Sequence, residues 1–301
     1  MTAATPTLSR PGPAAPAGAS SLGRRRKKIP PARIIAFVIL VVLAFAWLVP
    51  VLWAVLTSLK TEAEAAAMPV SIFPESGFTL ASYIEVLSAG RVPRWAWNSL
   101  FTSAMVTLIT VIISSLAGYA LSRMRFTGRK MIISLILASI MIPGQILIVP
   151  LFQLMLSLNL VDTYWGIILP QVVAAPMVFI LMKFFDQIPY ELEEAALMDG
   201  ASRFRILMSI ILPLSRPILG AVSIFVFIGA WNNFLWPFIV VNDANLMTLP
   251  TGLQTVISAY GIQYAQNMAQ AVLAALPLIV VFLFFQRQII KGISTTGIAG
   301  T

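Results

Sequence analysis

The side chains best able to do chemistry gather in one polar segment of the second half of the chain. Between Lys183 and Arg205 this segment carries five carboxylates and three basic residues. Carboxylates can act as general acids or bases and can bind cations. The chain has no histidine and no cysteine, which excludes the commonest general base, thiolate nucleophiles and Cys/His metal sites. We therefore predict no catalytic centre, metal or cofactor. The five acids are Asp186, Glu191, Glu193, Glu194 and Asp199.

A second polar feature is an asparagine pair inside an otherwise apolar stretch, Gly229–Pro237. Adjacent asparagines in lipid are costly unless they are hydrogen bonded. Amides flanked by aromatic rings suit a neutral polyol, because they offer donors, acceptors and apolar ring faces. Alternatively, both asparagines hold neighbouring helices together. The candidate solute-contacting residues are Trp231, Asn232, Asn233 and Phe234.

The composition is that of an all-α membrane protein. Of 301 residues, 59% are apolar and 10% are charged, and the mean hydropathy is +0.91. A soluble domain carries about 25% charged residues. Residues 1–31 are rich in Ala, Pro, Ser and Gly, end in a basic cluster, and are predicted to be a disordered tail. Residues 32–301 are predicted to form one membrane domain.

Six apolar segments are each long enough to cross a hydrocarbon core of about 30 Å. The third contains Pro143 and Pro150, and the fourth contains Pro170 and Pro176. Since proline removes a backbone donor, we expect both segments to be bent or broken. The predicted spans are 34–57, 98–121, 131–157, 164–185, 217–241 and 270–290.

The basic residues define the orientation of these spans. In the six-span arrangement, 17 of the 20 basic residues fall on the side of the two termini. Only Lys60, Arg91 and Arg94 fall on the other side. The positive-inside rule therefore places both termini in the cytoplasm. Topology also explains the net charge of +9, so nucleic acid is not expected as a partner.

The sequence contains no recognisable site that could supply energy for transport. No acidic residue lies near the middle of a predicted span, as a proton or cation relay would require. The chain also lacks the G-x-x-x-x-G-K-[ST] loop that binds ATP. A transporter of this kind must receive energy from another polypeptide. An ion-coupled secondary transporter remains the alternative, because unwound backbone can bind Na⁺. A membrane enzyme would need paired acids, and no such pair is visible.

The acidic segment contains a predicted surface helix at about 189–200. Pro189 suits the first turn, and the nearby glutamates favour the positive end of the helix dipole. Gly200 suits the position just beyond the end, where φ is often positive. The helix either links two spans or serves as a docking surface. Its capping pattern alone is typical of a helix that only links two spans, whereas the excess of acids, unusual for a cytoplasmic loop, is an argument for docking.

This helix carries a family resemblance. The run E-A-A-L-M-D-G, followed after nine residues by I-I-L-P, resembles the signature of permease subunits of binding-protein-dependent ABC importers. The stretches M-I-P-G-Q-I-L-I-V-P and W-N-N-F-L-W-P look like the carbohydrate branch, in particular the maltose-permease G-subunit type. The resemblance covers about 32–300. The long N-terminal tail departs from that subfamily.

The resemblance implies a type I ABC importer permease in a bacterial inner membrane. It implies a heterodimer with a second six-span permease, two ATPase subunits beneath the pair and an extracytoplasmic solute-binding protein above. The cargo would be an oligosaccharide, monosaccharide or glycerophosphate. The helix would fit a cleft of the ATPase and transmit its closure. The ATPase-coupling residues would be Glu194, Ala195, Ala196, Met198, Asp199 and Gly200.

Overall fold

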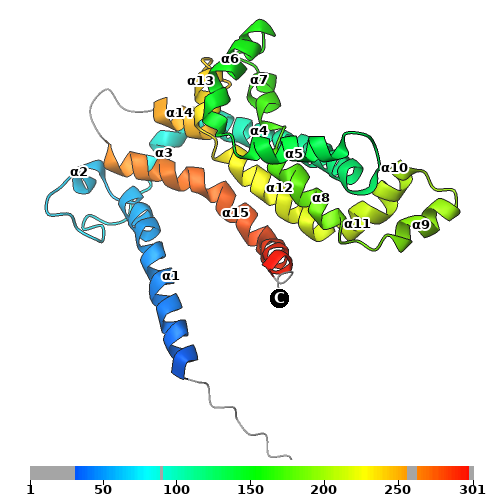
Figure 1. Ribbon diagram of the computed structural model, residues 1–301. Coiled ribbons are helices and arrows are strands. Elements are labelled where there is room, and N and C mark those ends of the chain that lie inside the picture. The colour runs from blue at the N-terminus through cyan, green and yellow to red at the C-terminus, as the bar shows by residue number, and fades with distance from the viewer. Residues whose placement is uncertain (1–30, 89–90, 256–262, 298–301) are drawn as a thin grey trace, which may run out of the picture. The chain divides into compact units, whose positions relative to one another are not determined.

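The computed structural model describes residues 31–88, 91–255 and 263–297, and every regular element in these ranges is helical (Figure 1). The predicted tail at 1–31 lies almost wholly outside the described residues. The elements are α1 (Pro31–Ser58), α2 (Glu62–Ala65), α3 (Ala81–Ser88), α4 (Val92–Arg123), α5 (Arg129–Ile140), η1 (Gly144–Leu147), α6 (Ile148–Ser157), α7 (Tyr164–Ile168), η2 (Leu169–Gln171), α8 (Ala175–Phe185), α9 (Glu191–Met198), α10 (Arg203–Ile206), η3 (Leu207–Ile211), α11 (Leu212–Leu214), α12 (Arg216–Trp231), α13 (Leu235–Val240), α14 (Leu249–Thr255) and α15 (Tyr264–Gly297).

The chain divides into two compact units, Met1–Val49 and Pro50–Thr301. The described part of the first unit is the beginning of α1, whose large apolar side chains from Ile34 to Val49 are exposed. An exposed apolar helix of this kind is suited to contact with lipid. All packing described below lies within the second unit.

Three described helices are long and apolar enough to cross a membrane, and three bent helix pairs have the same property when each pair is taken together. The long helices are Ala32–Ser58, Val92–Arg123 and Tyr264–Leu283. The predicted third span bends by 95° before Gly144, and the predicted fourth bends by 48° before Ala175. The sequence therefore predicted both breaks correctly.

The predicted fifth span, 217–241, is not one continuous helix. Helix α12 ends at Trp231, and α13 begins at Leu235. The side-chain amide of Asn232 donates to the backbone carbonyl of Ile228, and Pro237 cannot donate the N–H that would continue the helical hydrogen bonds. The bent pair long enough to span is instead Arg203–Leu214 with Arg216–Trp231, at an angle of 82°.

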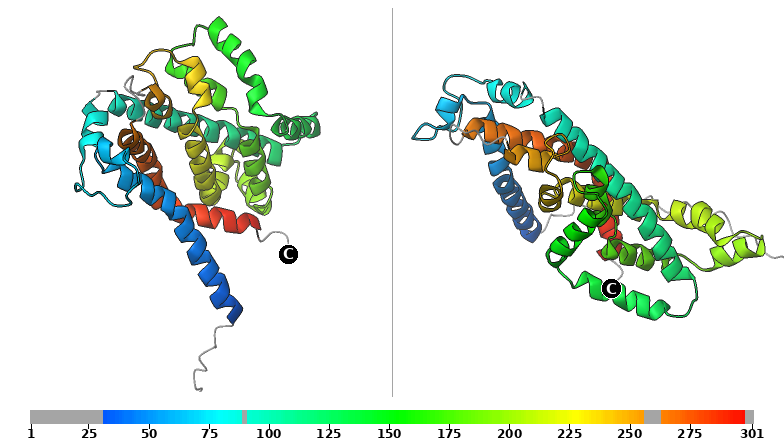
Figure 2. Two further views of the ribbon diagram at one scale, coloured as in Figure 1. Left: turned by 90° about the vertical axis from the view of Figure 1, so that its left-hand side faces the viewer. Right: turned by 90° about the horizontal axis from the view of Figure 1, so that it is seen from above.

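Helix α4 is the centre of the second unit. It packs against α8 and α12, and α12 packs in turn against α15 (Figures 1 and 2). Small residues allow the close approach: a Cβ on Gly118 would lie 3.1 Å from the backbone nitrogen of Met182. The Thr110 hydroxyl donates to the carbonyl of Val172 at 3.1 Å. Small side chains thus set the separation of α4 and α8.

The two ends of α4 reach different surroundings. Near its beginning, Trp95 Nε1 donates to the carbonyl of Ala244, and Ser99 accepts from the backbone of Leu249 in α14. At its end, Arg123 contacts α9. Helices α9 and α14 therefore lie at opposite ends of the unit (Figure 2). Ser99 and Arg123 are about 36 Å apart along the axis at 1.5 Å per residue.

Candidate functional site

The predicted surface helix is present as α9, which is shorter than expected. It begins at Glu191, two residues after Pro189, which lies outside it. It ends as predicted: Gly200 has φ +80°, and its N–H donates to the Leu197 carbonyl at 3.0 Å. The next N–H, of Ala201, donates to the Ala196 carbonyl at 2.9 Å. These two bonds form a Schellman motif, which needs a residue in the left-handed region at this point.

A buried carboxylate on α9 organises the surrounding elements. Glu193 is fully buried, and its Oε1 lies 3.0 Å from Arg123 Nε. Its Oε2 lies 3.6 Å from Arg203 Nη1 and accepts from the Tyr119 hydroxyl at 3.4 Å. Two arginines and a hydroxyl therefore compensate the charge of one carboxylate. Because the partners belong to α4 and α10, Glu193 joins α9 to both.

Arg123 also connects the end of α4 to the segment after α8. Its guanidinium donates to the carbonyls of Phe185 and Ile188, the latter at 2.5 Å, and lies 5.7 Å from the ring centre of Tyr190. A second link joins Ser122 to Asp186 at 2.7 Å. The chain leading into α9 is thereby held against the end of α4.

From sequence, Glu193 was predicted only as a first-turn acid, and its partners Arg123 and Arg203 were not predicted. A local signal was available: Glu193 lies three and four residues before Ala196 and Leu197, the half-buried residues that pack against the core. Residues at these spacings share one face of a helix. An acid on the apolar face of α9 implies a basic partner beneath it.

The predicted coupling residues lie mainly on the exposed face of α9. Only Ala196 packs against the hydrophobic core, whereas Met198 is 88% exposed. Leu192, on the same short helix, is also exposed. A large exposed apolar side chain on a rigidly held helix is typical of an interaction surface. The exposed members of the predicted set are Glu194, Ala195, Met198, Asp199 and Gly200.

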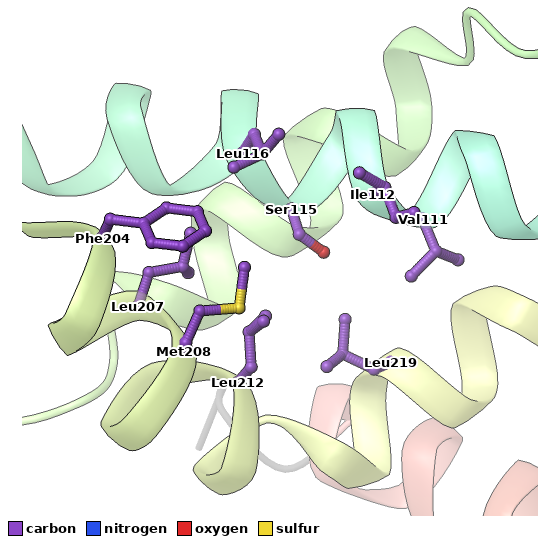
Figure 3. A pocket seen from close by; sticks show the side chains of 9 residues that line it. All are labelled: Val111, Ile112, Ser115, Leu116, Phe204, Leu207, Met208, Leu212 and Leu219. Carbon is purple, nitrogen blue, oxygen red and sulfur yellow. The ribbon is translucent and has the colours of Figure 1, made fainter.

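An apolar cavity of about 280 Å³ lies beside this region (Figure 3). It separates part of α4 from η3, a π-helical turn at Leu207–Ile211, and from the start of α12. Its one polar side chain is Ser115, which lies among apolar neighbours such as Phe204 and Met208. The segment from α10 to α12 is therefore not close-packed against α4 along its whole length.

The predicted solute-contacting residues lie at the break between α12 and α13 and differ in their surroundings. Asn233 Nδ2 donates to Gln171 Oε1 at 2.7 Å, and its Oδ1 accepts from the Trp236 backbone at 3.3 Å. Asn232 is exposed, and its amide donates to the Ile228 carbonyl at 3.0 Å. Asn233 thus joins helices, while Asn232 leaves its carbonyl oxygen free of any bond to the described residues.

The two aromatic members of this set also differ. Trp231 is buried, and its Nε1 donates to the carbonyl of Ala274 in α15 at 3.4 Å. Phe234 is partly exposed, stacks on Phe238 at 5.1 Å and lines a cavity of about 480 Å³. The structure therefore brings Phe234, rather than Trp231, to an accessible surface.

No group of three potential metal-ligating side chains occurs among the residues that the structure describes.

Comparison with known proteins identifies relatives over most of the chain. Residues 111–295 match the family model described as "Binding-protein-dependent transport system inner membrane component". The arabinooligosaccharides transport system permease protein AraQ of Halalkalibacterium halodurans is 38% identical over 260 residues, 86% of this chain and 93% of the relative. The trehalose/maltose transport system permease protein MalG of Thermococcus litoralis is 34% identical over 273 residues, 89% of this chain and 97% of the relative.

A solved structure shares the fold. It is a bacterial ABC transporter involved in the import of the acidic polysaccharide alginate, with a TM-score of 0.77 and 22% sequence identity. The similarity covers 86% of this chain and 98% of the matched chain.

Proposed function

The chain belongs to the family of inner membrane components of binding-protein-dependent transport systems, and we propose that it forms half of the translocation pathway of an ATP-driven importer for a carbohydrate or related polyol. It is a transport subunit and not itself an enzyme. The family also argues against the ion-coupled alternative.

The proposed membrane topology has six spans with both termini in the cytoplasm. This proposal is supported by three long helices and three bent pairs among the described residues, which allow up to six crossings if each bent pair forms one span. The distribution of basic residues supports the cytoplasmic position of the termini. The separation of about 36 Å between Ser99 and Arg123 exceeds a hydrocarbon core of about 30 Å. Helix α9 then faces the cytoplasm, and α14 faces outward.

The proposed partners follow from the proposed role as half of an ATP-driven importer. Because this permease has no ATP-binding loop, it needs separate ATPase subunits. Because it forms only half of the translocation pathway, it also needs a second permease of the same fold. Dependence on a binding protein is part of the family description. We expect a heterodimer above two ATPase subunits in a bacterial inner membrane, with an extracytoplasmic protein delivering the carbohydrate.

The observation that carries the coupling role is the contrast between the two faces of α9. The inner face is fixed to α4 and α10 through the buried Glu193. The outer face presents Glu194, Met198 and Gly200 to solvent. A movement imposed on the exposed face therefore passes directly to α4, which reaches the opposite end of the molecule.

Substitutions on the exposed face test the proposal. Gly200→Asp and Glu194→Lys should abolish uptake, while the protein still inserts in the membrane. Gly128→Asp is the matched control, because Gly128 also has positive φ (+87°), has no atom within 4 Å of an added Cβ and lies outside α9. Normal uptake by both α9 variants would reject the docking role.

The partners can be tested separately by purifying a tagged chain from gently solubilised membranes. Mass spectrometry should identify a P-loop ATPase and a second six-span permease. Recovery of the chain alone, from cells that still import the solute, would contradict the proposed assembly.

A further inference from the structure

The cavity of about 480 Å³ lies at the end of the second unit opposite α9. Its walls are Phe234 from the break after α12, part of α14, and one face of α15. Pockets that bind small molecules measure about 300–1,000 Å³. The carbonyl of Ala274, a lining residue, accepts from Trp231 Nε1, so the predicted Trp231–Phe234 segment shares a wall with this cavity.

The lining combines apolar side chains with polar ones and contains no charged side chain. It includes three carboxamides, of Gln254, Asn267 and Gln270, together with the apolar surfaces of Phe234 and Leu253. Asn267 and Gln270 are three residues apart on α15 and therefore share a face of that helix. Each carboxamide offers both a donor and an acceptor, as each sugar hydroxyl does.

Gln270 is the most informative lining residue. Gln270 is only 6% exposed, and its side-chain Nε2 has no hydrogen-bond partner among the described residues. Buried amide groups are nearly always hydrogen bonded in folded proteins. Gln270 lines the cavity, so a turn of its side-chain amide would let a ligand there supply the missing hydrogen bond.

We propose that this cavity is a subsite for one neutral sugar residue of the imported carbohydrate, with Gln270 as its central hydrogen-bonding group. The inference rests on the proposed importer function and extends it to a site formed mainly by α14 and α15. We propose a neutral ligand because none of the lining residues carries a charged side chain. Phe234 presents an aromatic face to the apolar side of a sugar ring, as in many pockets for neutral ligands.

The first test is uptake by cells that express the complete importer, with arabinotriose and maltose as neutral probes and an alginate trisaccharide as the anionic probe. Gln270→Leu should raise the KM of the imported neutral sugar about tenfold, with little change in maximal rate, because a hydrogen-bonding group of the ligand loses its partner. Gln266→Leu is the matched control: it lies four residues earlier on α15, is equally buried at 6% and does not line the cavity.

The second test measures occupancy directly. The chain has no cysteine, so Gln254→Cys introduces its only thiol at an exposed position of the cavity. The imported neutral sugar should slow labelling by an impermeant maleimide, whereas labelling of Ser76→Cys, outside the cavity, should not change. This variant leaves Gln270 in place, so it remains informative if Gln270→Leu fails to insert.

The outcomes separate this inference from the proposed function. If Gly200→Asp abolishes uptake while Gln270→Leu leaves KM unchanged and sugar gives no protection, the subsite is rejected and the importer stands. Import of the anionic probe alone rejects a neutral ligand. Normal uptake by both Gly200→Asp and Glu194→Lys rejects the coupling mechanism itself.

Discussion

The carboxylate of Glu193 lies 3.0 Å from Arg123 Nε, and the two side chains are 0% and 6% exposed. This pair joins the short helix α9 to the end of α4, a helix of 32 residues that is long and apolar enough to cross a membrane. A buried ion pair is weak evidence of stability by itself, but removing one partner leaves an uncompensated charge. The pair therefore makes the position of α9 dependent on that of α4.

Glu193→Gln should destabilise the protein by about 3–5 kcal/mol, because Arg123 would remain buried without its carboxylate. The thermal midpoint of the purified importer measures this effect. The neighbouring exposed residue provides the control, since Glu194→Gln should change stability by no more than about 0.5 kcal/mol. Equal midpoints for the two variants would contradict the assigned role of Glu193.

Gly200→Ala should cost about 1 kcal/mol, because the residue has φ +80°, where a Cβ is disfavoured. Nothing lies within 4 Å of the added atom, so the cost arises from the backbone alone. Gly144→Ala also adds a Cβ in open space, but at a negative φ, and should be nearly neutral. Thermal unfolding of both variants checks the prediction, and an equal effect would argue against a role for the left-handed conformation.

The two asparagines at the break after α12 should respond differently to substitution. Asn233→Ala removes the 2.7 Å bond to Gln171 and should lower the thermal midpoint. Asn232→Ala removes a bond only within α12 and should leave stability nearly unchanged. If Asn232 contacts the solute, its variant should raise the KM for uptake. An unchanged KM for Asn232→Ala would remove it from the predicted pathway.

Asp162 should make the contact between the loop before α7 and the loop after α13 dependent on pH. Burial acts to raise the pKa of this carboxyl, but the backbone N–H groups of Asp243 and Asn242 donate to it and hold its pKa below the ordinary value. A lowered pKa in the folded state stabilises the protein above the ordinary value of about 4, and this contribution is lost as the pH falls through the folded value.

The measurement is limited proteolysis of the loops that Asp162 connects, before α7 and after α13. At pH 7 the wild type should resist cleavage better than Asp162→Asn, which keeps a residue tolerant of the observed φ of +57°. The difference should shrink as the pH falls below about 4. If the difference in cleavage between wild type and Asp162→Asn stays constant with pH, the carboxylate charge of Asp162 does not cause the resistance to cleavage.

Much of the fold could be predicted because its signals are local. Long apolar runs predicted the helices, and Pro143 and Pro176 predicted two of the bends, since proline acts within one turn of its own position. No break was predicted within the fifth span, because hydropathy does not register an amide that bonds a backbone carbonyl one turn earlier. Asn232 and Pro237 interrupt that helix although the segment stays apolar.

The sequence by itself determined the membrane class and the surface helix that stops before Gly200, because both depend on composition or on neighbouring residues. Only the tertiary structure decided which side chains meet. The packing of α4 against α8 and α12 brings Arg123 to Glu193, 70 positions later in the chain. The approach of α15 to the break after α12 likewise places Gln270 and Phe234 around one cavity. Such pairings depend on helix packing over long separations, which no local pattern encodes.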